Sequence, residues 1–173
     1  GDYSICLLNG KGTDSNSEKA IQLLKEASEQ GSWYSNYLLA QCYLQGKGVK
    51  EDKPQALKLL RQSHEGGCTE ATYLLAHCLH NAEGVNLEDF SSATLEESRD
   101  LYEEAAQKGH AKAAYELGVI FSKNIEIFAN KEKAFHLFQI ADNKNYLPAI
   151  TELGILYEEG EGVQKNCQKA ITL

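Results

Sequence analysis

The chain has 173 residues, enough for one compact domain or a short array of stacked repeats, and 42% of them are hydrophobic, as in ordinary globular proteins. Its formal charge of −8 argues against nucleic acid or an anionic membrane as the main partner, although moderate acidity also simply favours solubility. No apolar run approaches the roughly 18 residues of a membrane-spanning helix, so we expect no direct membrane insertion by this segment.

A glycine or an asparagine recurs along the chain at a nearly constant spacing. Gly31, Gly67, Gly109 and Asn145 are separated by 36, 42 and 36 residues. Each follows and precedes the same kind of segment, rich in Ala and Leu. A repeat of this length predicts an all-α fold, an α-solenoid in which pairs of antiparallel helices stack.

Small and apolar residues recur at fixed offsets within each repeat. Counting Ser35, Ala71, Ala113 and Ala149 as offset 0, such residues return at offsets 4, 5 and 8 and predict one buried face of a first helix. A second helix follows, with a buried stripe spaced 0, 3, 4 and 7. Its members are Ala20, Leu23, Leu24, Ala27; Ala56, Leu59, Leu60, Ser63; Ser98, Leu101, Tyr102, Ala105; and Ala134, Leu137, Phe138, Ala141. The expected helices are 35–45, 55–66, 70–80, 95–108, 112–123, 131–143 and 148–158.

The loop between the two helices of a repeat is usually glycine-rich, because a helix end often needs a positive φ. It reads Gly46, Gly48, Val49 in one repeat and Gly160, Gly162, Val163 in another, but the loop at 124–127 has no glycine and should differ.

Six extra residues lie between Val85 and Glu97, and they account for the 42-residue interval. Thr94 and Glu97 have the spacing of a capping box that would begin the next helix. Phe90 is a bulky aromatic in this polar insertion loop, at 86–96. Insertions in solenoids often lie on a binding face, so Phe90 is a candidate contact residue, while a tolerated surface insertion is the alternative.

The cysteines are predicted to be unpaired. Cys6, Cys42 and Cys78 are 36 residues apart, at an offset that later repeats fill with aliphatic residues, so we expect them buried in the core. Neighbouring helices pack ~8–10 Å apart, too far for a disulfide. Cys68 is placed at a helix start and Cys167 in a loop. This pattern favours a reducing compartment such as the cytoplasm.

Catalytic and metal-binding signatures are missing from the sequence. There is no Gly-x-Ser-x-Gly elbow, phosphate-binding loop or Ser-x-x-Lys motif. His77 and His80 share a helix face beside Cys78, but no further ligand follows, and zinc sites need three or four. We therefore expect no enzyme activity, no metal and no cofactor; a hydrolase is the least favoured hypothesis.

The repeated residues resemble the Sel-1-like repeat, a relative of the tetratricopeptide repeat. The resemblance rests on Ala113, Tyr115, Leu117, Gly118, Phe121, Lys133, Ala134 and Ala141, and on Leu153, Gly154, Tyr157, Gly160, Gly162, Val163, Lys169 and Ala170. It covers the whole chain and implies a right-handed superhelix of three full repeats flanked by two partial ones. The expected repeat units are about 1–34, 35–70, 71–112, 113–148 and 149–173, in a segment of a longer protein.

The resemblance implies a protein-binding adaptor in which the first helices line a concave groove. Offsets 3, 6 and 10 should face that groove, since the other apolar offsets are buried. The candidate contact residues are Leu38, Gln41, Gln45, Leu74, His77, Asn81, Glu116, Val119, Lys123, Glu152 and Ile155. Such a surface suits a helix or an extended segment with apolar anchors and some basic residues. The alternative is self-association through the solenoid ends.

Overall fold

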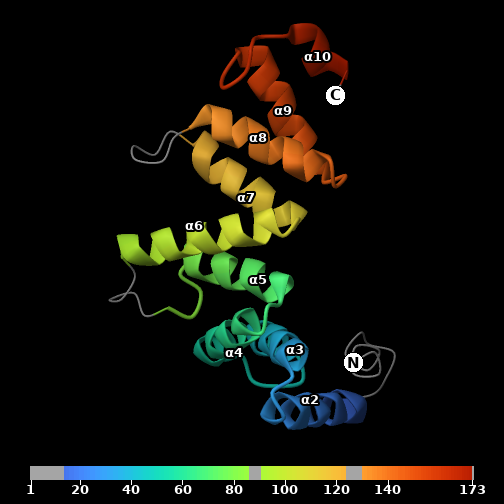
Figure 1. Cartoon of the computed structure of the whole chain (residues 1–173). Coiled ribbons are helices and arrows are strands. Elements are labelled where there is room, and N and C mark those ends of the chain that lie inside the picture. Colours follow the sequence, from blue (N-terminus) through green and yellow to red (C-terminus); the bar gives the residue numbers. More distant parts are fainter. Residues whose placement is uncertain (1–13, 86–90, 124–129, 173) are drawn as a thin grey trace. The chain divides into compact units, whose positions relative to one another are not determined.

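The computed structural model describes residues 14–85, 91–123 and 130–172, and all of their regular structure is helical (Figure 1). The helices are α2 (Asp14–Glu29), α3 (Trp33–Gln45), α4 (Lys53–Glu65), α5 (Thr69–His80), α6 (Ser92–Gln107), α7 (Ala111–Ser122), α8 (Lys131–Asp142), α9 (Leu147–Glu159) and α10 (Cys167–Thr172). The predicted all-α solenoid is therefore confirmed. Each expected helix is present, with boundaries within three residues of those expected.

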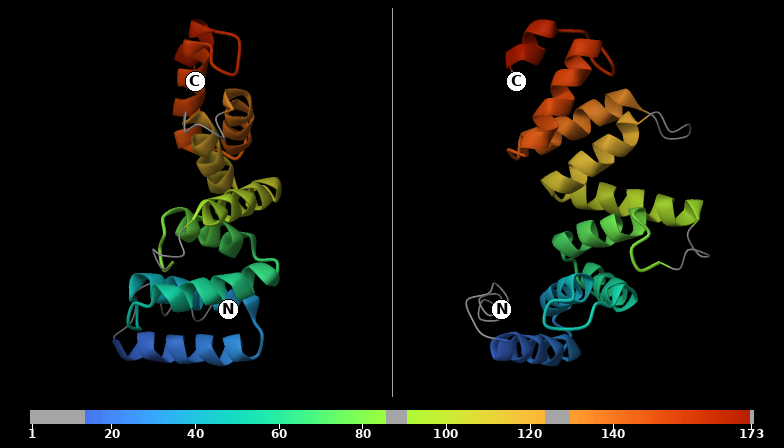
Figure 2. Two further views of the ribbon diagram at one scale, coloured as in Figure 1. Left: turned by 90° about the vertical axis from the view of Figure 1, so that its left-hand side faces the viewer. Right: turned by 180° about the vertical axis from the view of Figure 1, so that it is seen from behind.

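The chain divides into two compact units, 1–98 and 99–173, and the division falls within α6. In the N-terminal unit, α3 packs against α2 and α4, and α4 packs against α5. In the C-terminal unit, α8 packs against α7 and α9, and α9 packs against α10. Figure 2 shows the same helices from two further sides.

The buried stripes explain why the helices pair. Ala56 and Leu60 of α4 are fully buried, as are Ala134 and Phe138 of α8, at the offsets that the sequence predicts. Three stripe positions are not buried as expected: Leu23 of α2 is 43% exposed, and Ala27 and Leu137 are half-buried. Ile21 is buried instead, because the face of α2 that packs on α3 carries Ala20, Ile21 and Leu24.

The punctuating residues end their helices in the left-handed conformation. Gly31, Gly67 and Gly109 have φ of 82°, 85° and 84°, and Asn145 has φ of 60°. Asparagine tolerates this region better than other side chains do, which is why it can replace glycine there. Ala82 has φ of 56° after α5, at the offset where other repeats carry Gly46 or Gly160.

One backbone hydrogen bond closes the helical hairpin in three repeats. The amides of Asp52, Asn130 and Asn166 donate to the carbonyls of Tyr43, Phe121 and Tyr157, at 3.0, 3.0 and 2.8 Å. Each pair is nine residues apart, and each donor residue then caps its second helix through its own side chain. The ends of the glycine-free loop are therefore joined as in the other repeats, although 124–129 lie outside the described residues.

The second loop glycine fits against the preceding repeat. A Cβ on Gly84 would lie 2.7 Å from the Lys53 carbonyl, and one on Gly162 would lie 2.2 Å from the Lys131 carbonyl. The same two lysines pair with the residues just before these glycines, Glu83 and Glu161. Glycine is needed here for close approach as well as for its positive φ.

The insertion lengthens α6 rather than forming only a loop. α6 begins at Ser92, so Thr94 and Glu97 do not form the predicted capping box. The carbonyl of Ser91 instead accepts from the amides of Thr94 and Leu95, and the Ser91 amide donates to Thr94 Oγ1 at 3.5 Å. Glu97 forms a two-pronged pair with Arg61 of α4 instead.

The cysteine prediction holds where the structure describes it. Cys42 and Cys78 are free and 3% and 1% exposed, and burial raises the pKa of both thiols, that of Cys78 to about 12. Cys6 lies outside the described residues. Cys68, which sequence reasoning left unassigned to the core, is also buried. Cys167 was wrongly placed in a loop, since it is the exposed first residue of α10.

Candidate functional site

The predicted contact residues divide between the two compact units. Those on α3 and α5 lie in the N-terminal unit, and those on α7 and α9 lie in the C-terminal unit. The half-buried members are Gln41, Leu74, His77, Glu116, Val119 and Glu152. The exposed members are Gln45, Asn81, Lys123 and Ile155. We use the name first-helix surface for these residues, without Leu38, in each of the two units taken by itself. Phe90 lies outside the described residues.

Leu38 does not belong to this surface. Its side chain is 8% exposed and is part of the core, so the prediction that offset 3 of α3 is open to a partner is wrong. The reason is that α3 is packed between α2 and α4, which leaves only a narrow strip of α3 in contact with water. Leu74, at the same offset of α5, remains half-buried.

Polar members of the surface in the N-terminal unit are held by their own helices. The Gln41 amide donates to the Tyr37 hydroxyl at 2.9 Å, and the Asn81 amide donates to the His77 carbonyl at 2.8 Å. The His77 ring lies 6.1 Å from the Tyr73 ring. Burial raises the pKa of Tyr37, and the nearby thiol of Cys68 and carboxylate of Glu70 add to this. The polar side chains of this surface therefore contact residues of their own helices.

The C-terminal unit brings together aromatic rings and carboxylates. The Tyr115 ring lies 5.2 Å from that of Tyr146, the residue preceding α9, and 5.8 Å from that of Phe138. Burial is the largest cause that raises the pKa of Tyr115, and the carboxylates of Glu152 and Glu116 raise it further. Burial also raises the pKa of Tyr146, and the carboxylate of Glu116 raises it further. The four residues Tyr115, Tyr146, Glu116 and Glu152 are called the tyrosine–glutamate cluster below.

Sequence reasoning found the two carboxylates but missed the tyrosines. The sequence marks Tyr115 only as one of the residues that carry the Sel-1-like resemblance, and it does not single out Tyr146. One signal was available: Tyr146 directly follows Asn145, so it begins the approach to a first helix. The pairing of the two rings depends on how α7 and α9 are placed around α8, and periodicity alone does not specify that.

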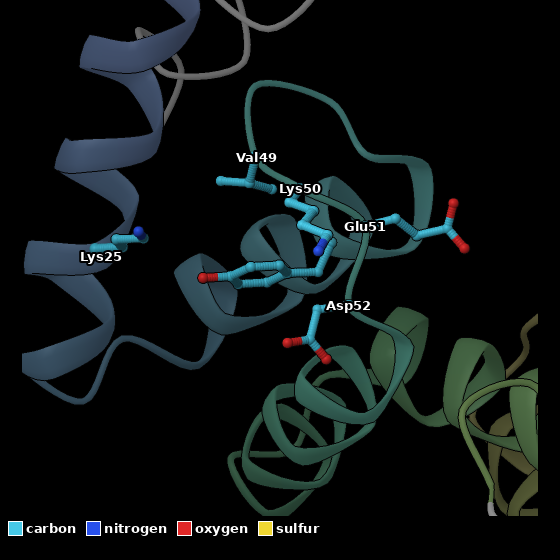
Figure 3. Close-up of a pocket in the computed structure, with 6 residues that line it drawn as sticks. Lys25, Val49, Lys50, Glu51 and Asp52 are labelled. Atoms are coloured by element: carbon cyan, nitrogen blue, oxygen red, sulfur yellow. The ribbon is translucent and has the colours of Figure 1, made fainter.

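A small hollow of about 360 Å³ opens beside the α3–α4 loop, and Figure 3 shows its lining residues. Lys25 comes from α2, while Lys50 and Glu51 come from the loop that faces it (Figure 3). The two acidic residues have other partners: Glu51 pairs with Lys53, and Asp52 accepts from the Gln55 amide at the start of α4. The hollow is wide open, and nothing in it points to a particular ligand.

A second hollow, of about 450 Å³, lies between α9 and α10. It is lined largely by apolar side chains, namely Ile150, Gly154, Ile155, Ala170 and Ile171. Ile171 is 86% exposed and Ile155 is 42% exposed. This surface, the α9–α10 hollow, therefore offers apolar area to another protein chain.

Within the described ranges, no group of three His, Cys, Asp or Glu side chains is placed to hold a metal ion. In the same ranges no helix is both long and apolar enough to cross a membrane.

Comparison with known proteins matches this architecture to one family. The model of the Sel1 repeat matches residues 2–32, 33–68, 69–110, 111–143 and 147–173. No curated protein sequence matches the chain.

Three solved structures have the same fold at low sequence identity. A protective antigen of uropathogenic Escherichia coli, which displays an SLR fold, is 21% identical with a TM-score of 0.86; the alignment covers 98% of this chain and 35% of that one. A Sel1 repeat protein from Oxalobacter formigenes is 21% identical with a TM-score of 0.84, over 98% of this chain and 66% of that one. Immunity protein Pa5087 from Pseudomonas aeruginosa is 23% identical with a TM-score of 0.61; the alignment covers 99% of this chain and 61% of that one. The chain thus spans about a third of the first structure and two thirds of the second. The five consecutive matches and the shared helix-pair fold show that the chain belongs to the Sel1 repeat family.

Proposed function

We propose that this chain is a protein-binding adaptor, and that its first-helix surface contacts another protein or peptide. Sel1 repeats generally mediate protein–protein interactions, and their solenoid is typically a scaffold without enzymatic activity. The observation that carries the proposal is that apolar side chains stay partly in water on three first helices. They are Leu74 of α5, Val119 of α7 and Ile155 of α9.

The contrast with the second helix α4 supports this choice of surface. Apart from Pro54 in its first turn, the exposed residues of α4 are all polar or charged: Lys58, Arg61, Gln62 and Glu65. The contrast holds for α4 alone, since the other second helices expose Leu23, Leu95 and Ile140. An interface gains free energy when it covers such aliphatic side chains. Interaction sites typically combine such apolar anchors with a polar rim, and Gln41, His77 and Glu152 supply polar groups of this kind.

Site-specific photo-crosslinking in the cells that make the protein would test the proposal. A benzophenone amino acid replaces Leu74 or Ile155 in one set of variants, and Lys58 or Glu132, both exposed on second helices, in the control set. We expect the first set to form a covalent adduct of one defined mass with a protein other than a second copy of the chain, and the control set to form none. Adducts of equal yield from both sets, or adducts from the control set alone, would contradict the proposal.

The α9–α10 hollow favours a second candidate function, self-association. Its apolar lining and the 86% exposure of Ile171 would let a second copy of the chain cover it. Light scattering of the purified chain as a function of concentration decides this. A dimer that dissociates in Ile171→Asp but persists in Glu103→Gln would support self-association through α10, and a monomer at all concentrations would exclude it.

A further inference from the structure

The tyrosine–glutamate cluster combines two kinds of group that attract cations. The rings of Tyr115 and Tyr146 are half-buried and 5.2 Å apart, so part of each ring still reaches the surface. The face of an aromatic ring is electron-rich and attracts an ammonium or guanidinium group within about 6 Å. The same unit already uses this contact internally, since Lys169 Nζ lies 4.7 Å from the centre of the Tyr157 ring.

The two carboxylates of the cluster are near the rings and have no cation of their own. Glu116 lies next to Tyr115 on α7, and Glu152 projects from α9. Burial is the main cause that raises the pKa of Tyr115, and the carboxylates of Glu152 and Glu116 add to it. In the part of the chain that the structure describes, neither Glu116 nor Glu152 forms an ion pair, whereas Glu83, Glu97, Glu104 and Glu161 all do.

The nearby basic residue Lys144 does not neutralise this charge. Its ammonium group lies against the Gly109 turn, 3.8 Å from where a Cβ on that glycine would be. The same surface carries Val119 and Ile155, which lie one turn beyond Glu116 and Glu152 on their helices. Negative charge, aromatic rings and aliphatic side chains therefore lie together, on a chain with a formal charge of −8.

We infer that the tyrosine–glutamate cluster binds a lysine or arginine side chain of a partner protein segment, with an aliphatic neighbour of that side chain resting on Val119 and Ile155. The cation lies against the tyrosine rings and between the two carboxylates, and charge complementarity selects a basic partner over an acidic one. The inference rests on the proposed adaptor function and adds the chemistry of the segment that is recognised.

A library of random twelve-residue peptides displayed on phage provides the test. Peptides are selected on the full chain, synthesised, and measured by fluorescence anisotropy against four variants. Glu116→Gln with Glu152→Gln removes both charges with little change in shape, and Glu103→Gln with Glu132→Gln removes two exposed charges of the same unit elsewhere. Tyr146→Phe keeps the ring, and Tyr146→Leu removes it. Thermal unfolding by circular dichroism verifies that each variant is folded.

The inference predicts peptides enriched in Arg or Lys next to an aliphatic residue. Their affinity should fall about tenfold or more in the cluster double variant and less than twofold in the charge-matched control. Tyr146→Phe should bind nearly as the original chain does, whereas Tyr146→Leu should bind several-fold more weakly. Raising the salt from about 0.05 to 0.3 M should weaken binding, because exposed charge pairs are screened.

Selected peptides without basic residues, a failure to select any peptide, or equal binding by the cluster and control variants would overturn the inference. These results differ from a failure of the adaptor function. If benzophenone at positions 74 and 155 still captures a partner in the cluster double variant, the function stands and only the partner chemistry is wrong. If those positions capture no partner in the otherwise unaltered chain, the adaptor function itself is wrong.

Discussion

Gly118 and Gly154 occupy the same offset on the first helices α7 and α9, but they have different surroundings. A Cβ on Gly118 would lie 2.6 and 2.8 Å from two atoms of the Phe138 ring, which is fully buried and cannot move into solvent. A Cβ on Gly154 would meet only the Ala170 carbonyl oxygen, at 3.7 Å, an ordinary contact. The two positions therefore form a matched pair for substitution by alanine.

The expected free energies follow from two effects. Alanine in a helix interior is about 1 kcal/mol more favourable than glycine, and this gain applies equally at both positions. The overlap with Phe138 costs about 1–3 kcal/mol, as overpacking of a close-packed core usually does. Gly154→Ala should thus be stabilised by up to about 1 kcal/mol, and Gly118→Ala should be less stable than Gly154→Ala by about 1–3 kcal/mol. Gly118→Leu should be more severely destabilised, because its longer side chain overlaps further.

Thermal unfolding followed by circular dichroism measures the difference. For a chain of this size, 1 kcal/mol corresponds to a shift in Tm of about 2–4 °C, so the two alanine variants should differ by roughly 2–12 °C. Phe138→Leu added to Gly118→Ala should cost less than Phe138→Leu alone, since the smaller side chain relieves the overlap. Equal Tm values for Gly118→Ala and Gly154→Ala would refute the packing of α7 on α8 described above.

Three further outcomes are expected. Ala82→Gly should stabilise the chain by about 1 kcal/mol in thermal unfolding, because the left-handed φ of 56° strains alanine and not glycine. Cys167 should react with iodoacetamide in the native chain while Cys78 should not, as mass spectrometry of the labelled peptides will show. Because burial raises the pKa of Cys78 to about 12, the contribution of this thiol to the stability of the fold should be complete below pH 9.0 and fall as the pH rises from there towards 12. Leu38→Glu should unfold the N-terminal unit by placing a charge in the core, whereas Leu74→Glu should leave the helical circular dichroism intact.

Each of these outcomes has a clear contrary result. A lower Tm for Ala82→Gly would mean that the turn after α5 does not need a positive φ. Rapid labelling of Cys78 before unfolding, or stability that does not change above pH 9.0, would contradict its burial. A well-folded Leu38→Glu variant would return that position to the first-helix surface.

The period of the repeat, the helices and most of the core follow from the sequence by itself. Helix formation and capping depend on residues within a few positions of one another, and a solenoid core is built from the same offsets in every repeat. This is why the burial of Cys42 and Cys78 and the positive φ at Gly31 and Asn145 could be predicted. Family membership follows from the same periodic residues.

Only the tertiary structure decided what happens where helices from different repeats meet. Leu38 is buried because two helices pack on α3, and Glu97 pairs with Arg61, which is 36 residues away. The contact between Tyr115 and Tyr146 likewise brings a residue of α7 against the residue that precedes α9. Such contacts depend on the angle and spacing between packed helices, which a pattern of offsets within one helix does not specify. Leu38 is the predicted contact residue that the structure contradicts, because its burial depends on the helices packed against α3, whereas a partner contact by the others stays a prediction.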